Sequence, residues 1–225
     1  MKRLILVLIL AFPLSLQAQS PGYQGKHFIL SYSPDINLTN YFLGVFNPIP
    51  HENVFGLFLR HNIMAEYVVN RTLSIGLEYT FLNTDLGITE NDSYQYIMKL
   101  NSGQFGFNFI FYTGENNPVA PVGNYLKFKF FVNNYSANVV SPVPNPIPPN
   151  APNPQSVTGQ NFGIGFGFGH NHVVANRLII TYGGSIDYNI DNTQNTTVLN
   201  QRAYEHFVGA YLLPSLRFGV GGLLF

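Results

Sequence analysis

The sequence predicts an all-β protein: an eight-stranded antiparallel transmembrane β-barrel of the up-and-down kind. Three observations predict it. An export signal opens the chain, apolar and polar residues alternate in segments of about ten residues, and no later stretch is apolar for long enough to cross a bilayer as a helix. With 225 residues, the chain is long enough for one such domain.

The start of the chain has the layout of a secretory signal peptide. Its first residues include two basic side chains, the run 4–16 is almost wholly apolar, and Ala18 is a small residue suited to cleavage. A membrane-spanning helix is the alternative, but such a helix needs about 20 apolar residues, and this run is shorter and contains a proline. We therefore predict a signal peptide over residues 1–18 and secretion of the remainder through the inner membrane.

Composition limits the class of protein further. Only 10% of residues are charged and 15% are aromatic, and the 21 glycines and 15 prolines suit strands joined by turns. The formal net charge is zero, so the chain has no electrostatic footprint for nucleic acid. It has no cysteine, which excludes disulfides, thiolate catalysis and cysteine-ligated metal. We expect residues 19–225 to form one barrel domain held by its fold alone.

Alternation along the sequence predicts the individual strands. From Thr72 to Leu82 the odd positions are large and apolar and most even positions are small or polar, which is the period of a strand with two different faces. The same pattern recurs at residues 104–112, 126–132, 162–169 and 178–190. Weaker segments lie at about residues 26–33, 54–69 and 206–225. The total of eight is even, as an antiparallel barrel requires when both of its ends lie on one side.

The sizes of the two strand faces decide which face points outward. One face is built from Phe, Tyr, Leu and Ile, and the other largely from Gly, Ser, Thr and Asn. The lumen of an eight-stranded barrel is narrow and accepts the small set but not the large one. The large side chains should therefore face lipid.

The predicted linkers alternate in length. Short linkers are expected at about residues 70–71, 114–124 and 173–177, and long ones at about residues 34–53, 84–100, 133–158 and 191–203. With the N-terminus in the periplasm, the short turns fall on the periplasmic side and the long loops outside, as in bacterial outer-membrane barrels. One long loop holds a proline-rich stretch at residues 140–156, which favours an extended, projecting conformation.

Together, the signal peptide, the eight segments and the aromatic last residue Phe225 resemble the small outer-membrane barrels of the OmpA/OmpX type. The resemblance implies outer-membrane residence, contact with outer-membrane lipid and periplasmic chaperones, and a role for Phe225 as the signal for the barrel-assembly machinery. Phe225 and Phe218 have opposite parity, so a bulge near Gly221 and Gly222 is needed if both face lipid. No peptidoglycan-binding domain follows the barrel, so the wall-anchoring role of larger relatives is not implied.

A set of charged residues falls on the predicted inner face and forms the candidate site: Arg60, Glu66, Glu78, Lys127, Lys129, Asp187 and Arg217. Across the predicted hairpin, Glu78 should lie opposite a residue near position 62, with Arg60 as its diagonal neighbour. Ion pairing would turn this set into a plug of a closed lumen, and the alternative is the lining of a small pore.

Other residues suggest chemistry only weakly. His170 and His172 share a strand face and could bind a metal, but they lack a nearby carboxylate, so we expect neither metal nor cofactor. Related barrels include lipid-modifying enzymes and proteases with residues at the membrane rim, and His61, His206, Ser74 and Asp85 could take such roles, although no motif joins them.

The glycines at alternate positions from Gly163 to Gly169 are better suited to a smooth inner wall than to a phosphate loop. A strand pattern runs through them, and no helix start follows. We expect bulky neighbours such as Phe58 or Phe131 to pack on this wall.

The sequence therefore predicts a non-enzymatic outer-membrane barrel whose long loops serve envelope structure or surface interaction, including contact with an extracellular ligand that the sequence does not identify. Two alternatives remain open: a small channel or porin, and a rim-located lipid-modifying enzyme or protease.

Overall fold

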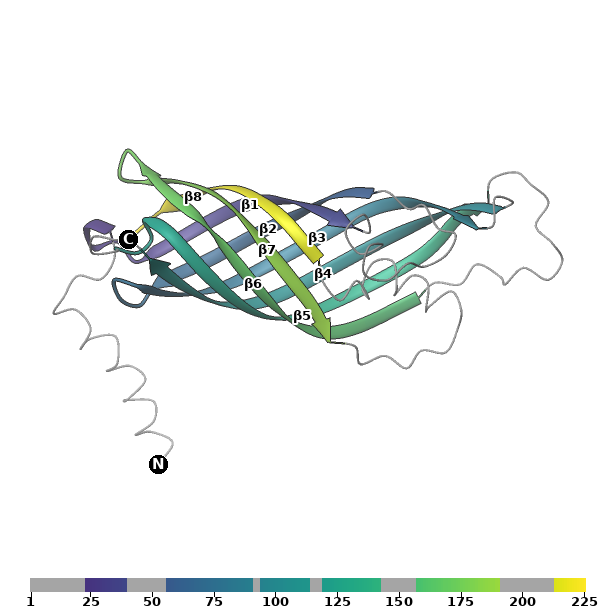
Figure 1. Cartoon of the computed structure of the whole chain (residues 1–225), viewed down its shortest axis with the longest axis horizontal. Coiled ribbons are helices and arrows are strands. Elements are labelled where there is room, and N and C mark those ends of the chain that lie inside the picture. The colour runs from purple at the N-terminus through teal and green to yellow at the C-terminus, as the bar shows by residue number, and fades with distance from the viewer. Residues whose placement is uncertain (1–22, 40–55, 91–93, 114–118, 143–156, 191–212) are drawn as a thin grey trace, which may run out of the picture.

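The computed structural model describes residues 23–39, 56–90, 94–113, 119–142, 157–190 and 213–225. After a short 3-10 turn at Tyr23–Gly25, this part of the chain forms eight strands: β1 Phe28–Thr39, β2 Gly56–Val68, β3 Leu73–Glu90, β4 Tyr94–Thr113, β5 Gly123–Pro142, β6 Val157–Val174, β7 Leu178–Ile190 and β8 Leu213–Leu223. Each strand pairs antiparallel with the next, and β8 pairs with β1, so the sheet closes into a barrel (Figure 1). The predicted fold class is confirmed.

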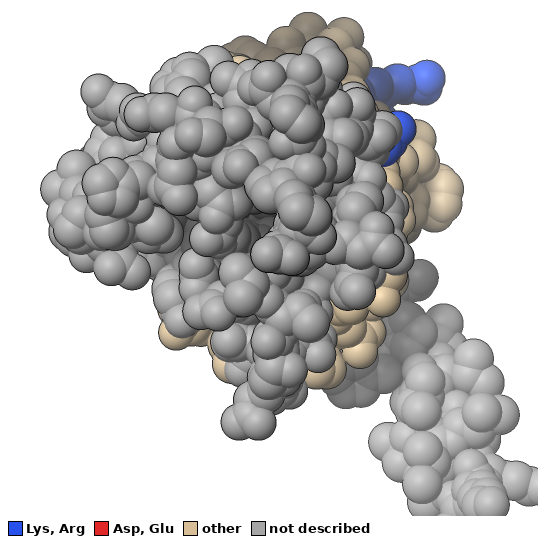
Figure 2. Space-filling model, turned by 90° about the vertical axis from the view of Figure 1, so that its right-hand side faces the viewer, with Lys and Arg blue, Asp and Glu red and all other residues tan. Residues whose placement is uncertain are grey.

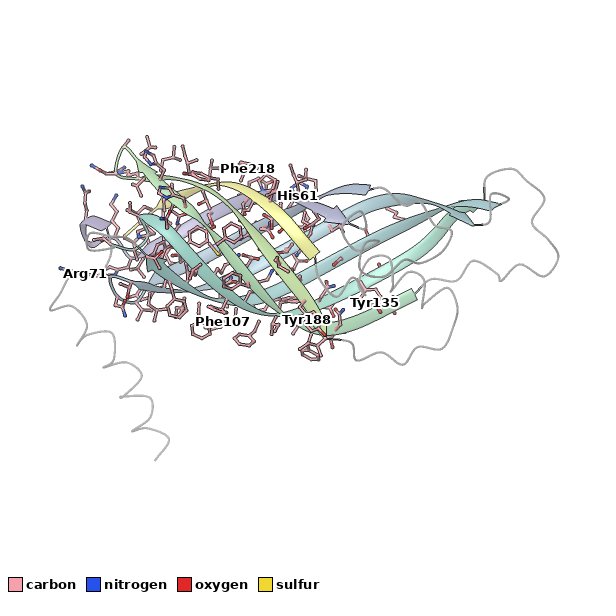
Figure 3. The ribbon with its side chains drawn as sticks, in the orientation of Figure 1. His61, Arg71, Phe107, Tyr135, Tyr188 and Phe218 are labelled. Atoms are coloured by element: carbon pink, nitrogen blue, oxygen red, sulfur yellow. The ribbon has the colours of Figure 1, made fainter. Side chains whose placement is uncertain are left out.

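The orientation predicted for the large side chains is confirmed as well. On β4 the side chains of Phe105 and Phe111 are 53% and 41% exposed, whereas Gln104, whose side chain is on the other face, is 5% exposed. The same alternation holds around the barrel, and labelled rings such as Phe107 and Phe218 point away from it (Figure 3). The outer surface is apolar and the inner face is polar, which is the pattern of a barrel surrounded by lipid.

At one end the inner face carries a cluster of apolar side chains. Ile29, Val68, Ile110, Ile179 and Leu223 pack there with Tyr112, Tyr125 and Ala120. This is the end at which the β2–β3 and β6–β7 turns, residue 23 and the C-terminus lie (Figure 1). The apolar cluster therefore seals the barrel on the side of the short turns.

Several predicted loops are partly strand, and these predictions were wrong. Most of residues 84–100 belongs to the paired strands β3 and β4, which stay in register from Leu73↔Phe111 to Glu90↔Tyr94. Residues 133–142 likewise extend β5, and β1 continues to Thr39. The apolar outer face of these strands stops earlier than the pairing: the odd positions beyond Phe81 and Phe105 begin with Asn83 and Gly103. The alternation that marks a lipid-facing strand therefore ends although the backbone pairing continues.

Some predictions fall outside the described residues. They concern the signal peptide, His206, the greater part of the proline-rich stretch, the first part of the expected segment 206–225, and most of the loop 34–53.

Candidate functional site

All seven charged residues predicted to face inward lie on the inner wall and are buried. They come from five of the eight strands, and most of them meet near the middle of the barrel. The structure adds an eighth member, Asp35 on β1, which is 1% exposed. Sequence analysis missed Asp35 because Pro34 interrupts the apolar alternation just before it, and the segment was assigned to a loop.

Glu78 on β3 is the centre of this cluster. Its carboxylate accepts hydrogen bonds from Arg217 Nη1 at 3.0 Å and Lys127 Nζ at 3.0 Å on one oxygen. Lys129 Nζ lies 3.4 Å from the other oxygen. Three cations from two other strands therefore surround one carboxylate, which satisfies the buried anion and holds β3, β5 and β8 together across the lumen.

Arg217 also binds Asp35 in a bidentate arrangement. Its Nε and Nη2 each donate to one carboxylate oxygen at 2.8 Å. The two residues are direct register partners on β8 and β1. This fork-to-carboxylate pair therefore ties the last strand to the first, with the planar geometry that arginine provides.

A second anion, Asp187 on β7, completes the cluster. Its Oδ2 accepts a hydrogen bond from Lys129 Nζ at 2.8 Å and lies 3.3 Å from Arg60 Nη2. The same guanidinium donates to Gln104, whose Nε2 lies 3.5 Å from Asp187 Oδ2. Lys129 contacts both Asp187 and Glu78, so the two anionic centres form one connected network.

The predicted proximity of Arg60 and Glu78 was wrong, because the β2–β3 hairpin is centred one residue further along the chain than that pairing requires. Met64, not a residue near 62, pairs with Glu78. Asn70 explains the difference: its Oδ1 accepts backbone hydrogen bonds from Thr72 and Leu73, both at 2.8 Å, which shapes a four-residue connection between β2 and β3. A register shift of two keeps every side chain on its predicted face but changes its neighbours.

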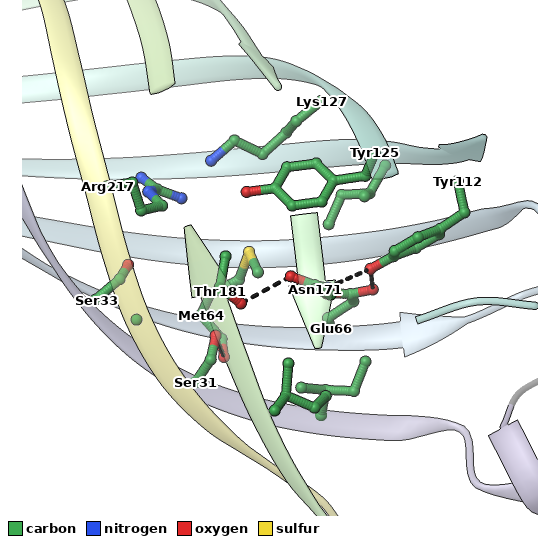
Figure 4. Close-up of a pocket in the computed structure, with 14 residues that line it drawn as sticks. Ser31, Ser33, Met64, Glu66, Tyr112, Tyr125, Lys127, Asn171, Thr181 and Arg217 are labelled. Carbon is green, nitrogen blue, oxygen red and sulfur yellow. Dashed lines mark hydrogen bonds between the residues drawn. The ribbon is translucent and has the colours of Figure 1, made fainter. Parts of the chain in front are cut away.

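Glu66 is set apart from the network, nearer the sealed end. Among the described residues it has no ion-pair partner, and its Oε1 accepts a hydrogen bond from the Tyr112 hydroxyl at 2.7 Å (Figure 4). Asn171 Nδ2 donates to that hydroxyl at 3.2 Å, and Thr181 donates to Asn171 Oδ1 at 2.7 Å. A chain of polar groups from three other strands therefore satisfies this carboxylate.

The described lumen has a small cavity among its charged side chains. Beside Glu66 lies a cavity of about 20 Å³, bordered by Lys127 and Arg217 and by small polar side chains such as Ser31. That volume accommodates roughly one water molecule. Four buried cations face four buried anions, Asp35, Glu66, Glu78 and Asp187, so the side chains balance one another in formal charge.

The inner wall of β6 explains how a narrow barrel holds these long side chains. Each large inward residue of β5 lies directly opposite a glycine: Tyr125↔Gly169, Lys127↔Gly167, Lys129↔Gly165, Phe131↔Gly163 and Tyr135↔Gly159. A Cβ atom at Gly163 would overlap the Phe131 ring. The prediction that Phe131 packs on this wall is confirmed. Lys129 Nζ also lies over the Phe131 ring, 5.1 Å from its centroid. The side chain of Phe58 lies outside the described residues.

The residues considered for catalysis do not come together. Ser74 is buried on the inner face, whereas His61 lies on the outer face, where its Nδ1 is 2.6 Å from the Tyr32 hydroxyl and its ring stacks on Phe81. The side chains of Asp85 and His206 lie outside the described residues. The wall of the barrel therefore separates the two described candidates.

His170 and His172 lie on the outer face of β6 with ring centroids 6.5 Å apart. The ring of His170 contacts Asn124 Oδ1 at 2.7 Å and stacks on Tyr182. No group of three or more metal-ligating side chains occurs among the described residues.

The bulge predicted near Gly221 and Gly222 is absent. The β7–β8 register runs without a shift from Asp187↔Leu213 to Leu178↔Gly222. Phe225 instead lies beyond the end of β8, where its ring is 76% exposed and stacks on Phe28 at 5.7 Å. Because the strand ends at Leu223, the parity of Phe225 no longer determines which way its side chain points.

Comparison with known proteins supports the fold and goes no further. No helix among the described residues is long and apolar enough to cross a membrane. No family model matches the chain, and no curated protein matches its sequence. Among solved structures, a major outer membrane protein from Thermus thermophilus aligns with a TM-score of 0.53 at 11% identity, over 87% of this chain and 98% of that one.

Two further solved structures align less closely. Neisserial surface protein A gives a TM-score of 0.45 at 14% identity, over 88% of this chain and 97% of its own. Ail, the attachment invasion locus protein of Yersinia pestis, gives a TM-score of 0.45 at 9% identity, over 88% and 96%. The alignment with the Thermus protein and the barrel topology lead to one conclusion: the chain has the fold of the small outer-membrane β-barrels.

Proposed function

We propose that the protein is an integral outer-membrane barrel that neither conducts ions nor catalyses a reaction, and that acts through the sheet which β3–β6 raise above the lipid. The observation that carries the proposal is the filled lumen. Its charges are buried, all of them except Glu66 form ion pairs, and the cavity beside Glu66 has room for about one water. A conducting pore would need a continuous file of water, and a cavity for about one water is far smaller than that.

The outer surface marks where lipid should end on the side away from the termini. Along β3 the outward residue after Phe81 is Asn83, and along β5 the one after Val132 is Asn134. Gln160 on β6 lies just beyond Phe162 and donates a hydrogen bond to Asn134 at 3.0 Å. From Leu73 to Phe81 the strand covers roughly 20 Å of barrel height at a tilt of about 40°, close to the ~25 Å apolar band of outer-membrane barrels. Seen from the end away from the termini, the described residues around the periphery are almost all uncharged (Figure 2).

Beyond this boundary only part of the barrel continues. The β2–β3 pairing ends at His61↔Phe81 and the β6–β7 pairing at Phe162↔Ile190, whereas β3–β4 pairing runs on to Glu90↔Tyr94. The extended sheet is visible as the long right-hand part of the barrel in Figure 1. Its reach past Phe81 is roughly 30 Å along β3 at about 3.3 Å per residue. A sheet that extends this far beyond the apolar outer surface supports a role in contacts outside the cell.

Cysteine labelling tests this arrangement directly, because the chain has no cysteine of its own. In intact Gram-negative cells, Thr89→Cys at the far end of β3 should react with a large maleimide-polyethylene glycol reagent. Asn70→Cys, in the turn at the other end, should react only after the outer membrane is permeabilised. Labelling of Asn70→Cys alone in intact cells would reverse the proposed orientation.

Planar bilayer recording tests the closed lumen. The folded protein should show no stable single-channel steps above the lipid baseline, because ion-paired side chains fill the middle of the lumen. A steady conductance that changes when Arg60 or Lys127 is replaced by alanine would instead favour a small channel.

A further inference from the structure

We propose that the rim formed by the β6–β7 turn and the residues just before β1 is a binding site for the headgroup of an anionic phospholipid in the periplasmic leaflet. The proposal rests on the membrane residence proposed above. Two cations, Lys26 and Arg177, lie at this rim, and they belong to segments far apart in the sequence. Lys26 Nζ donates a hydrogen bond to the backbone oxygen of Asn176 at 2.8 Å, which places it beside the β6–β7 turn that carries Arg177.

The charge of this end differs from the charge of the lumen. Inside the barrel every cation of the network has an anionic partner. At the rim, neither Lys26 nor Arg177 forms an ion pair with a described residue, and Arg177 is exposed. Arg71, in the β2–β3 turn, adds a third exposed cation on the same end (Figure 3). The described residues of this rim therefore carry positive charge that no neighbouring side chain balances.

The anionic groups near the rim leave the two side chains unneutralised. The main-chain oxygen of Phe225 accepts backbone hydrogen bonds from His27 and Phe28 at 2.6 and 2.7 Å, and among the described residues it forms no ion pair with Lys26 or Arg177. No acidic side chain lies among the described residues of the turns at this end. Glu115 lies outside the described residues. Lys26 and Arg177 are therefore available to an anion from outside the protein.

A lipid is favoured over a free anion because the apolar surface begins directly below the cations. Leu178 follows Arg177 on the outer face of β7 and is 45% exposed, and Leu224 on the neighbouring strand end is 47% exposed. An acyl chain can lie on these side chains while its phosphate meets the lysine and arginine above them. Basic side chains at a lipid surface attract anionic headgroups in this way, and long cationic side chains reach the headgroup level from an apolar surface.

The experiment measures lipid binding to the mature protein in zwitterionic detergent by native mass spectrometry. Phosphatidylglycerol and phosphatidylcholine with identical acyl chains are titrated separately. The wild-type protein should bind phosphatidylglycerol more tightly, by roughly fivefold for each cation near the surface. The double variant Lys26→Gln/Arg177→Gln should bind both lipids equally, and the charge-keeping variant Lys26→Arg/Arg177→Lys should retain the preference.

Two controls separate the possible outcomes. Lys99→Gln removes an exposed cation from the opposite end of the barrel and should leave the lipid preference unchanged. Inorganic phosphate at millimolar concentration should not displace phosphatidylglycerol, because it lacks the acyl chains. Equal binding of both lipids by the wild type, a loss of preference in Lys99→Gln, or full displacement by phosphate would each overturn the proposal. None of these results depends on which end faces the cell exterior, so the proposed function is tested separately.

Discussion

Replacing Glu78 with glutamine should destabilise the folded barrel by about 3–5 kcal/mol, the range found when one partner of a buried ion pair is removed. The substitution keeps the shape of the side chain but removes the charge that faces Arg217, Lys127 and Lys129. Three cations would then remain buried around a neutral group, with Asp35 and Asp187 as their nearest anions. The free energy of unfolding is measured by guanidinium titration of the protein in lipid vesicles, followed by circular dichroism.

Glu66→Gln is the matched control for this prediction. Glu66 is as deeply buried as Glu78, but it is held by the Tyr112 hydroxyl and has no ion-pair partner among the described residues. An amide oxygen can accept the same hydrogen bond, so the loss should stay below about 1 kcal/mol. Adding Lys127→Met to Glu78→Gln should recover part of the stability, since it removes one unmatched cation. Equal losses for the two glutamine variants would contradict the assigned role of Glu78.

The second large effect is expected at the glycine wall of β6. Gly163→Ala should cost about 2–3 kcal/mol, because the new methyl group would overlap the Phe131 ring and lie 2.5 Å from the Tyr188 carbonyl oxygen. The ring is buried and cannot swing into lipid, so the strands must shift. The unfolding titration used for Glu78 measures this loss, and gel mobility before and after heating reports the folded fraction.

Gly222→Ala provides the comparison, because it adds the same methyl group to a strand glycine that has room. The nearest atom to a Cβ there is Leu224 Cδ2 at 3.6 Å, an ordinary contact. This variant should be neutral or slightly stabilising, since alanine restricts the unfolded chain more than glycine does. Phe131→Leu should relieve part of the Gly163→Ala defect. If Gly163→Ala and Gly222→Ala proved equally stable, the close packing of Phe131 on β6 would be refuted.

The sequence predicted which face of a strand each side chain occupies better than it predicted which side chains contact one another. Alternation alone placed Lys127, Lys129 and Arg217 on the inner wall, because lipid on one side and a narrow lumen on the other leave little choice. It could not predict that Lys127 meets Glu78 across the lumen. Such contacts depend on the tilt and stagger of all the strands in the barrel, which the alternation within a single strand does not determine.

Where the environment no longer distinguishes the two faces, the pattern lost its predictive power. Residues 84–90 and 94–100 pair as strands beyond the apolar outer surface, where lipid no longer selects large apolar residues at the outward positions. Asp35 was not predicted to face inward because the proline before it in β1 interrupts the alternation. Asn70, whose side chain accepts backbone hydrogen bonds in the β2–β3 turn, was a recognisable turn former that the prediction did not use.

The contact between Arg217 and Asp35 also bears on how the molecule is assembled. These residues lie 182 positions apart in the sequence, yet they face each other where the first and last strands pair. In an open sheet, Asp35 and Arg217 would lie on the two unpaired edge strands, and each side chain would be hydrated. Closure of the barrel therefore joins two events. The hydrogen bonds between β1 and β8 form as Asp35 and Arg217 are removed from water, so each charge is buried only when its counter-charge is in place.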